Sequence, residues 1–301
     1  MNVNMLSDFL KKEYGKKLYK ILLSSGMTCP NRDGKCGIGG CIFCSGRGSG
    51  EFTQKYDHDI SRQIEKAIGD LSDKERECGK YIAYFQAFSN TYDTPENLRK
   101  LYLPVVNRDD IAVLDIATRP DCLDDKVLEV LSQLNSIKPL WIELGLQTIN
   151  ENTAEYIRRG YSLSVYEEAV RKLRDRGIKV ITHLILGLPH ESKEDMINSA
   201  RFAGKYSDGL KFHALLVLKD TDLEKDFCEG KFSTLSREEY IDILCDCIRN
   251  VPENVVIHRL TSDSEVDNLV SPLWTLNKPR VLREIGNAFY DKDIFQGEYL
   301  K

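Results

Sequence analysis

Four cysteines lie within sixteen residues near the N-terminus, in the stretch Cys29 to Cys44, "CPNRDGKCGIGGCIFC". Proline, asparagine, aspartate and glycine separate them, and these residue types favour loops over helices and strands. Thiolates bind zinc and iron–sulfur clusters, and paired thiols form disulfides. The stretch therefore predicts a loop that binds a zinc ion, binds an iron–sulfur cluster or forms a disulfide knot.

The rest of the chain argues against the disulfide knot. The chain has nine cysteines, an odd number, and 301 residues are enough for a core without covalent cross-links. Its first residues, "MNVNMLSDFLKKEYGKK", lack the apolar core of a secretory signal, so we expect a cytoplasmic protein. In a reducing cytoplasm, clustered thiols are more often metal ligands than disulfides.

The spacing of the thiols bears on the choice between zinc and iron–sulfur. A structural zinc site usually pairs two short-spaced dithiol clips, whereas only Cys41 and Cys44 form such a clip and no second one follows downstream. A cluster held by three thiolates would leave one iron open, and it needs one distant thiol plus a clip. Phe43 would shield the metal from water.

The elements that position this loop follow from the apolar pattern. Runs rich in β-branched and aromatic residues alternate with polar segments of helical spacing, and such alternation implies parallel strands joined by crossover helices. The expected strands are residues 19–25, 81–88, 111–118, 140–148, 180–188 and 209–218. Near-continuous apolar strands are buried on both faces. Because no glycine-rich dinucleotide fingerprint follows the first strand, an α/β barrel is favoured over a doubly wound sheet.

Beyond residue 218 the pattern loosens into a helix at 236–250, a strand at 255–261 and a helix near 279–290. We therefore expect residues 1–218 to form the barrel and residues 219–301 to form a C-terminal α+β extension that caps it. In such a barrel the loops at the C-terminal ends of the strands carry the chemistry. The cysteine loop follows the first expected strand and meets this condition.

Several polar residues on the expected strands are predicted to face the lumen. By the period of two, Glu143, Gly145 and Gln147 share one face, and His213 alternates with Lys211. A buried strand carboxylate needs a partner, so Glu143 is a candidate for a functional role.

Composition limits the partners. The chain is 42% hydrophobic and 30% charged, and no apolar run reaches the length of a membrane span, so we expect no membrane partner. The net charge of −5 provides no general attraction to nucleic acid. A local basic patch is expected at Lys11, Lys12, Lys16, Lys17 and Lys20.

The cysteine stretch resembles the three-cysteine motif of radical S-adenosylmethionine enzymes, in the long-spaced form of the YhcC/YtqA group. This group is similar to elongator-type radical enzymes and oxygen-independent coproporphyrinogen oxidases, and "WIELGLQT", "HLILGLPHES" and "SPLWTLNK" resemble it too. The resemblance implies a partial parallel (β/α)6 TIM-like barrel. It also implies a 4Fe–4S cluster on Cys29, Cys41 and Cys44 that cleaves S-adenosylmethionine reductively. Cys36 is surplus and is expected to be a solvent-side thiol, since a fourth ligand would close the open iron.

The resemblance also implies contacts to S-adenosylmethionine. The turn "QAFSNT", with Gln86, Asn90 and Thr91, would receive the methionine amino group where many relatives carry a Gly-Gly-Glu turn. Gln147 would contact the ribose. Arg159 would pair with the methionine carboxylate, and the alternative for Arg159 is a surface charge at a helix end.

Further along the chain, Ile185 and Gly187 would approach the adenine, which glycine permits. Glu143 would orient the substrate or the sulfonium. Trp274 in the extension would either stack on a nucleobase or pack the extension onto the barrel.

For the substrate, the resemblance implies modification of the tRNA wobble-uridine side chain, with an external flavodoxin- or ferredoxin-like electron donor. The expected RNA-binding residues are Lys11 to Lys20, Arg158, Arg159, Lys172, Arg174 and Lys179. One alternative is a radical enzyme acting on a small porphyrin- or cofactor-like molecule. Another, of a different class, is a zinc-loop RNA-binding protein that uses all four cysteines of the loop.

Overall fold

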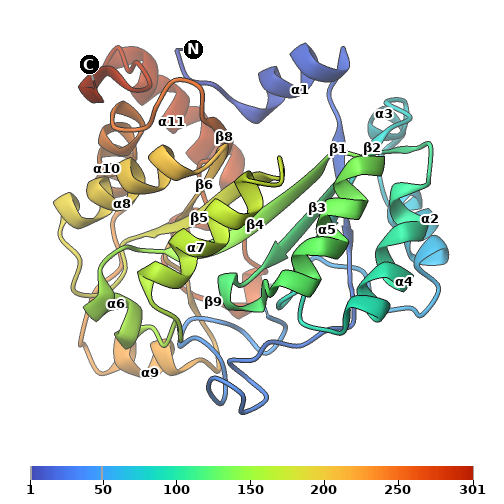
Figure 1. Ribbon diagram of the computed structural model, residues 1–301. Helices are drawn as coiled ribbons and strands as arrows, with labels where there is room; N and C mark the ends of the chain where they lie inside the picture. Colours follow the sequence, from blue (N-terminus) through green and yellow to red (C-terminus); the bar gives the residue numbers. More distant parts are fainter. Residues whose placement is uncertain (1, 49, 301) are drawn as a thin grey trace.

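A curved sheet of parallel strands forms the centre of the fold (Figure 1). The computed structural model describes residues 2–48 and 50–300, and in this part the main sheet has seven strands that curl into a half-barrel. Neighbours pair in parallel, in the order β1-β2-β3-β4-β5-β6-β8. The bounds are β1 Tyr19–Leu23, β2 Tyr81–Phe85, β3 Ile111–Thr118, β4 Leu140–Gln147, β5 Lys179–Leu186, β6 Gly209–Ala214 and β8 Val256–Arg259. The expected α/β partial barrel is confirmed.

Helices connect successive strands and bury their apolar stripes against the sheet. They are α2 Ile60–Gly69, α3 Asp73–Arg76, α4 Pro95–Val106, α5 Asp125–Ile137, α6 Glu151–Tyr156, α7 Leu163–Arg174 and α8 Lys193–Tyr206. In α5 the Asp124 side chain caps the first turn by accepting from the Val127 N–H, and Val127, Leu131 and Leu134 are buried. The strands are covered on both sides, and all five residues of β2 are buried.

The C-terminal region adds a strand to the barrel. The expected strand at 255–261 forms as β8 and pairs with β6, so this part of the extension completes the sheet and does not only cap it. A small antiparallel pair, β7 Val217–Leu218 and β9 Leu269–Ser271, lies beyond the end of β6. The helices here are α9 Asp222–Cys228, α10 Arg237–Arg249 and α11 Lys278–Asp291. The domain boundary at residue 218 stays a prediction.

The two ends of the half-barrel are closed differently. At the N-terminal ends of the strands, α1 Leu6–Tyr14 inserts Leu10 into an apolar cluster with Leu18, Ile82 and Trp141. At the C-terminal ends lies the long loop between β1 and α2, which carries the cysteines. Figure 1 shows α1 and this blue loop at opposite ends of the molecule. None of the helices among the described residues is both long and apolar enough to cross a membrane.

Candidate active site

A cavity of about 770 Å³ runs from the cysteine loop into the half-barrel. This size is typical of pockets that bind cofactors and small substrates. Side chains from β1, β2, β4, β5, β6 and β8 reach it, together with residues of the cysteine loop. The cavity thus opens at the C-terminal ends of the strands, where α/β barrels place their chemistry.

Cys29, Cys41 and Cys44 line this cavity together. Short backbone hydrogen bonds shape their loop, with the Cys44 N–H donating to the Cys41 carbonyl at 3.0 Å and the Arg32 N–H to the Cys29 carbonyl at 2.8 Å. The Asn31 amide lies 3.5 Å from the Cys41 sulfur and donates to the Arg158 carbonyl at 2.7 Å, which ties the loop to the region after α6. Burial, with the neighbouring Cys44 thiol, raises the pKa of Cys41 to about 12.

Cys36 is separate from the other three thiols. It is exposed, it does not line the cavity, and its sulfur lies 3.7 Å from an Asp121 carboxylate oxygen. Across residues 2–48 and 50–300, no three His, Cys, Asp or Glu side chains are grouped so that they could hold a single metal ion. Cys36 therefore differs from Cys29, Cys41 and Cys44 in exposure and in position relative to the cavity.

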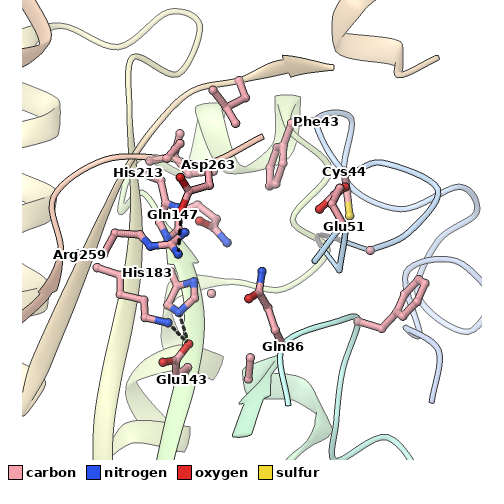
Figure 2. A pocket seen from close by; sticks show the side chains of 18 of the residues that line it. Phe43, Cys44, Glu51, Gln86, Glu143, Gln147, His183, His213, Arg259 and Asp263 are labelled. Carbon is pink, nitrogen blue, oxygen red and sulfur yellow. Dashed lines mark hydrogen bonds and ion pairs between the residues drawn. The ribbon is translucent and has the colours of Figure 1, made fainter. Parts of the chain in front are cut away.

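Glu143 lies deeper in the cavity, at the centre of a buried polar cluster (Figure 2). Its carboxylate accepts from Lys20 Nζ at 3.0 Å, from the Tyr84 hydroxyl at 2.6 Å and from Lys211 Nζ, and it lies 2.8 Å from His183 Nε2. The Glu143 side chain is fully buried. The buried carboxylate therefore has four partners, one each from β1, β2, β5 and β6.

Burial and the neighbouring charges together set the pKa values of the groups in this cluster. Burial by itself would raise the pKa of Glu143, but Lys20 and Lys211 outweigh it and hold that pKa well below its usual value. Asp115, 2.6 Å from Lys20 Nζ, has its pKa raised to about 7 by burial and by the charge of Glu143. Burial lowers the pKa of Lys211 to about 7 and that of His183 to about 4. Two groups of the cluster thus change charge near neutral pH.

Sequence reasoning missed most of these partners. Lys20 was expected to belong to a surface patch, which is wrong, because it lies on β1 and points into the barrel towards Asp115 and Glu143. The available signal was period-two alternation, in which a lysine or aspartate inside an apolar strand falls on a buried face. The inward positions of Lys211 and His213 agree with the sequence prediction.

Four of the residues expected to bind S-adenosylmethionine line the cavity, namely Gln86, Gln147, Arg159 and Ile185. Gln147 ends β4 with φ +69°, a conformation uncommon for a residue other than glycine and often seen at functional sites. A Cβ at Gly145 would lie 2.7 Å from Gln147 Nε2, so glycine there leaves room for the amide. Gly187 is not among the lining residues; it turns the chain after β5 with φ +91°.

Asn90 and Thr91 are not brought to the cavity. Both are buried, and their side chains bond to protein atoms: Asn90 donates to the Phe85 and Ala117 carbonyls at 3.1 and 2.8 Å. The Thr91 hydroxyl donates to the Cys122 carbonyl at 2.8 Å. In this structure the two residues hold the loop after β2 in place.

Arg159 touches the cavity wall, but its guanidinium is bound to the protein. It is fully buried and donates to the carbonyls of Tyr161 at 3.0 Å, Leu146 at 3.2 Å and Thr148 at 2.7 Å, and to the Glu151 carboxylate. The surface-charge alternative for Arg159 is therefore wrong. A contact with a methionine carboxylate would require some of these bonds to break.

Trp274 packs within the C-terminal extension and against the main hydrophobic core. It is half-buried against the main core, its ring lies 5.3 Å from that of Tyr240, and its indole N–H donates to the Leu235 carbonyl at 3.0 Å. It does not line the cavity. Trp274 therefore has a packing role in this structure, with its named contacts inside the extension.

Comparison with known proteins gives a consistent result. Residues 28–203 match the Radical SAM superfamily and residues 207–291 match the Radical_SAM C-terminal domain. The chain is 39% identical to protein YtqA of Bacillus subtilis, over 98% of this chain and 92% of that protein. It is 34% identical to protein YhcC of Escherichia coli, over 92% and 88%.

More distant likenesses point to a second group. A tRNA uridine(34) acetyltransferase of Methanocaldococcus infernus is 26% identical over 60% of this chain and 37% of its own length. The solved structure of Methanocaldococcus infernus Elp3 covers 93% of this chain and 64% of that one, with a TM-score of 0.68 at 18% identity. At this identity the likeness to Elp3 shows a shared fold.

Proposed function

Because this chain belongs to the radical S-adenosylmethionine (radical SAM) superfamily, we propose that it starts a radical reaction on the side chain of a tRNA wobble uridine. Enzymes of this superfamily use a 4Fe–4S cluster and S-adenosylmethionine. When bound, the cluster supplies the electron that cleaves S-adenosylmethionine to methionine and a 5′-deoxyadenosyl radical, which abstracts hydrogen from the substrate. An external one-electron donor, of the flavodoxin or ferredoxin kind, completes the proposal.

The cysteine loop fits such a cluster. Three thiols of one loop line one cavity, and Asn31 lies within hydrogen-bonding distance of the Cys41 sulfur. Burial raises the pKa of Cys41 and Arg119 opposes this only in part, so binding of iron would itself have to displace the thiol proton. In this proposal Cys29, Cys41 and Cys44 hold the cluster, and Cys36 does not.

One observation carries the proposal: the three thiols and the Glu143 cluster line the same cavity. A radical made at one end of a cavity must meet its substrate there before it meets water. The buried carboxylate, lysines and histidine would position a polar substrate beside it. Gln86, Gln147 and Ile185 line the same cavity, and they would contact S-adenosylmethionine.

The residues of the Glu143 cluster would hold and move protons at the substrate. Glu143 stays ionised, because Lys20 and Lys211 stabilise its charge. Lys211 Nζ lies 3.0 Å from the Tyr84 hydroxyl, and its pKa of about 7 lets it donate or accept a proton near neutral pH. We assign Glu143 to substrate orientation and Lys211 to proton transfer.

The choice of tRNA rests on the relatives. One of them is named a tRNA uridine(34) acetyltransferase, and position 34 is the wobble position. A suitable reaction breaks the bond between the amine nitrogen and the carboxymethyl carbon of a carboxymethylaminomethyl group on this uridine. Loss of a hydrogen atom from that carbon to the 5′-deoxyadenosyl radical, and of one electron back to the external carrier, would give an imine, which water hydrolyses to the aminomethyl group and glyoxylate. The basic residues expected to bind RNA need revision, since Lys20 and Arg159 are both buried in ion pairs or hydrogen bonds.

The proposal is tested first by S-adenosylmethionine cleavage. Anaerobically reconstituted protein is mixed with dithionite and S-adenosylmethionine, and 5′-deoxyadenosine is quantified for the wild type, Cys44→Ala and Cys36→Ala. We expect wild type and Cys36→Ala to release it and Cys44→Ala to release none. Loss in Cys36→Ala as well would contradict the three-ligand assignment.

The substrate is tested in a second step. Wild-type protein is incubated with tRNA that carries carboxymethylaminomethyluridine, and the tRNA is then digested to nucleosides and analysed by mass spectrometry. We expect a modified wobble uridine with wild type and an unchanged one with Cys44→Ala. If 5′-deoxyadenosine forms while every tRNA nucleoside stays unchanged, the tRNA part of the proposal is wrong and a small-molecule substrate takes its place.

A further inference from the structure

Arg259 occupies a distinctive place in the cavity. It is the last residue of β8, the strand that the C-terminal region adds to the barrel, and it pairs in register with Lys211 of β6. Its side chain lines the cavity and is 28% exposed. Figure 2 shows Arg259 and His213 on one wall, with Cys44 and Glu51 on the other side of the cavity.

The other cations of the cavity already have protein partners. Arg119 makes a two-pronged contact with Asp121 at 2.9 and 2.7 Å and donates to the Arg159 carbonyl. The Arg159 guanidinium is bound by three carbonyls and Glu151. Lys20 and Lys211 bind Glu143. The Arg32 guanidinium donates to the carbonyls of Cys44 and Ser45.

Arg259 differs from these cations. Within the described part of the chain, its one polar contact is a single 3.5 Å approach to the Asp263 carboxylate. Asp263 also pairs, at closer range, with Lys278. An arginine has five N–H donors in a planar fork, so most donors of Arg259 remain available in the cavity.

His213 provides a second, independent observation. Its Nε2 atom is buried and has no hydrogen-bond partner among the residues that the structure describes, and its ring lies 5.1 Å from that of His183. Buried polar atoms are nearly always satisfied, so an unpartnered one in a cavity wall points to a ligand. Arg259 pairs in register with Lys211, and His213 lies two residues further along β6 on the same face, so both side chains reach the same wall of the cavity (Figure 2).

We infer that Arg259 and His213 form an anion-binding subsite, in which the guanidinium of Arg259 holds a carboxylate of the substrate by a bidentate contact. A carboxylate matches the planar fork of arginine, and a neutral imidazole supplies one more hydrogen bond. The inference rests on the proposed function, because the carboxymethylaminomethyl group carries such a carboxylate. A second source of the same chemistry is the methionine carboxylate of S-adenosylmethionine.

The test compares two nucleosides that differ by the carboxymethyl group. Binding of 5-carboxymethylaminomethyluridine and 5-aminomethyluridine to the full-length reconstituted protein is measured by calorimetry, with S-adenosylmethionine present. Wild type is compared with Arg259→Gln, Arg259→Lys and the control Arg280→Gln. Arg280 is about half exposed, pairs with Glu284 and does not line the cavity.

We expect the wild type to prefer the carboxylated nucleoside. Arg259→Gln should reduce this preference roughly 10- to 100-fold, because a charge-assisted contact is lost. Arg259→Lys should restore part of it, and Arg280→Gln should match the wild type. Affinity for 5-aminomethyluridine and for S-adenosylmethionine should stay unchanged in all variants.

Two outcomes overturn the inference. One is a wild type without preference for the carboxylated nucleoside. The other is an Arg259→Gln variant that binds S-adenosylmethionine more weakly and both nucleosides as the wild type does, which assigns the subsite to the methionine carboxylate. A failure of the proposed function looks different: the tRNA nucleosides stay unmodified, while carboxylate binding still depends on Arg259.

Discussion

At the scale of residues, the unusual feature is a buried set of two lysines and two carboxylates. Lys20 bridges Asp115 and Glu143, and Lys211 pairs with Glu143 alone. Removing charges from water costs several kcal/mol per ion, so such a set is weak evidence for stabilisation. Its retention in a cavity is better explained by chemistry, because perturbed pKa values gather at functional sites.

Lys211 leads to a prediction about pH and stability. Burial lowers its pKa from 10.5 to about 7, so between these values the unfolded chain binds a proton that the folded protein has released. The free energy of unfolding should therefore rise with pH in this window, by up to about 1.4 kcal/mol per pH unit from this group. Urea unfolding of wild type and Lys211→Met at pH 7, 8, 9 and 10 measures the effect.

In Lys211→Met this contribution should be missing, so the stability difference between the two proteins should change steadily across the window. Titrating groups that do not interact with Lys211 are common to both proteins and cancel in the difference, whereas Asp115 and Glu143, whose pKa values Lys211 lowers, do not cancel. A difference that is the same at every pH would show that Lys211 keeps its ordinary pKa in the folded protein.

At the scale of elements, the cysteine loop and the helix that closes the barrel lie at opposite ends of the half-barrel. The loop after β1 carries the cysteines at the C-terminal ends of the strands, and α1 seals the N-terminal ends. β8 adds Arg259 to the cavity wall, so a strand from the C-terminal region contributes directly to the site. Stability and metal binding should therefore respond to different substitutions.

Leu10→Ala tests this separation. Leu10 is 3% exposed and packs against Leu18, Ile82 and Trp141, so its truncation should lower the free energy of unfolding by about 2–5 kcal/mol. The exposed Lys12→Ala on the same helix should change it by less than about 0.5 kcal/mol. Denaturant unfolding measures stability, and iron content after reconstitution measures the cluster. A loss of iron in folded Leu10→Ala would contradict the separation.

At the scale of the whole molecule, the net charge of −5 means that any RNA must bind through a local surface. Lys11, Lys12, Lys16 and Lys17 lie on or beside α1, at the end away from the cysteine loop (Figure 1). RNA that delivers a uridine to the cavity approaches from the other end. Exposed cations of the cysteine loop, such as Lys35 and Arg47, are better placed to contact it.

This placement predicts how RNA affinity depends on salt. For the proposed tRNA substrate, affinity should fall steeply with salt, and Lys35→Gln/Arg47→Gln should reduce the slope of log K against log salt by about 0.7–0.9 per lost phosphate contact. Replacing Lys11, Lys12, Lys16 and Lys17 by glutamine should leave the slope unchanged. Fluorescence anisotropy with labelled tRNA, at roughly 50 to 200 mM salt, measures the RNA affinity and its salt dependence for both sets of variants. The reverse pattern would place the RNA at the α1 end.

The sequence by itself determined the features that depend on local pattern. The cysteine loop, the order of parallel strands and the inward face of β4 follow from spacing and periodicity within short segments, and the structure brings Cys29, Cys41 and Cys44 to one cavity as expected. The β8 strand was also found as a segment. Its position beside β6 was not predicted, because the sequence of one strand does not specify which strand it pairs with.

The tertiary structure decided which charges meet. Lys20 and Glu143 are 123 residues apart, and Lys211 and Glu143 are 68 apart, so no local pattern predicts their contact. The sequence also does not predict whether an arginine is free to bind a ligand. The N–H donors of Arg159 are used by backbone carbonyls, whereas most of those of Arg259 remain available. Sequence specifies the kind of side chain on each face. Whether its hydrogen-bonding capacity is used by the protein or left for a ligand depends on neighbours that only folding brings together.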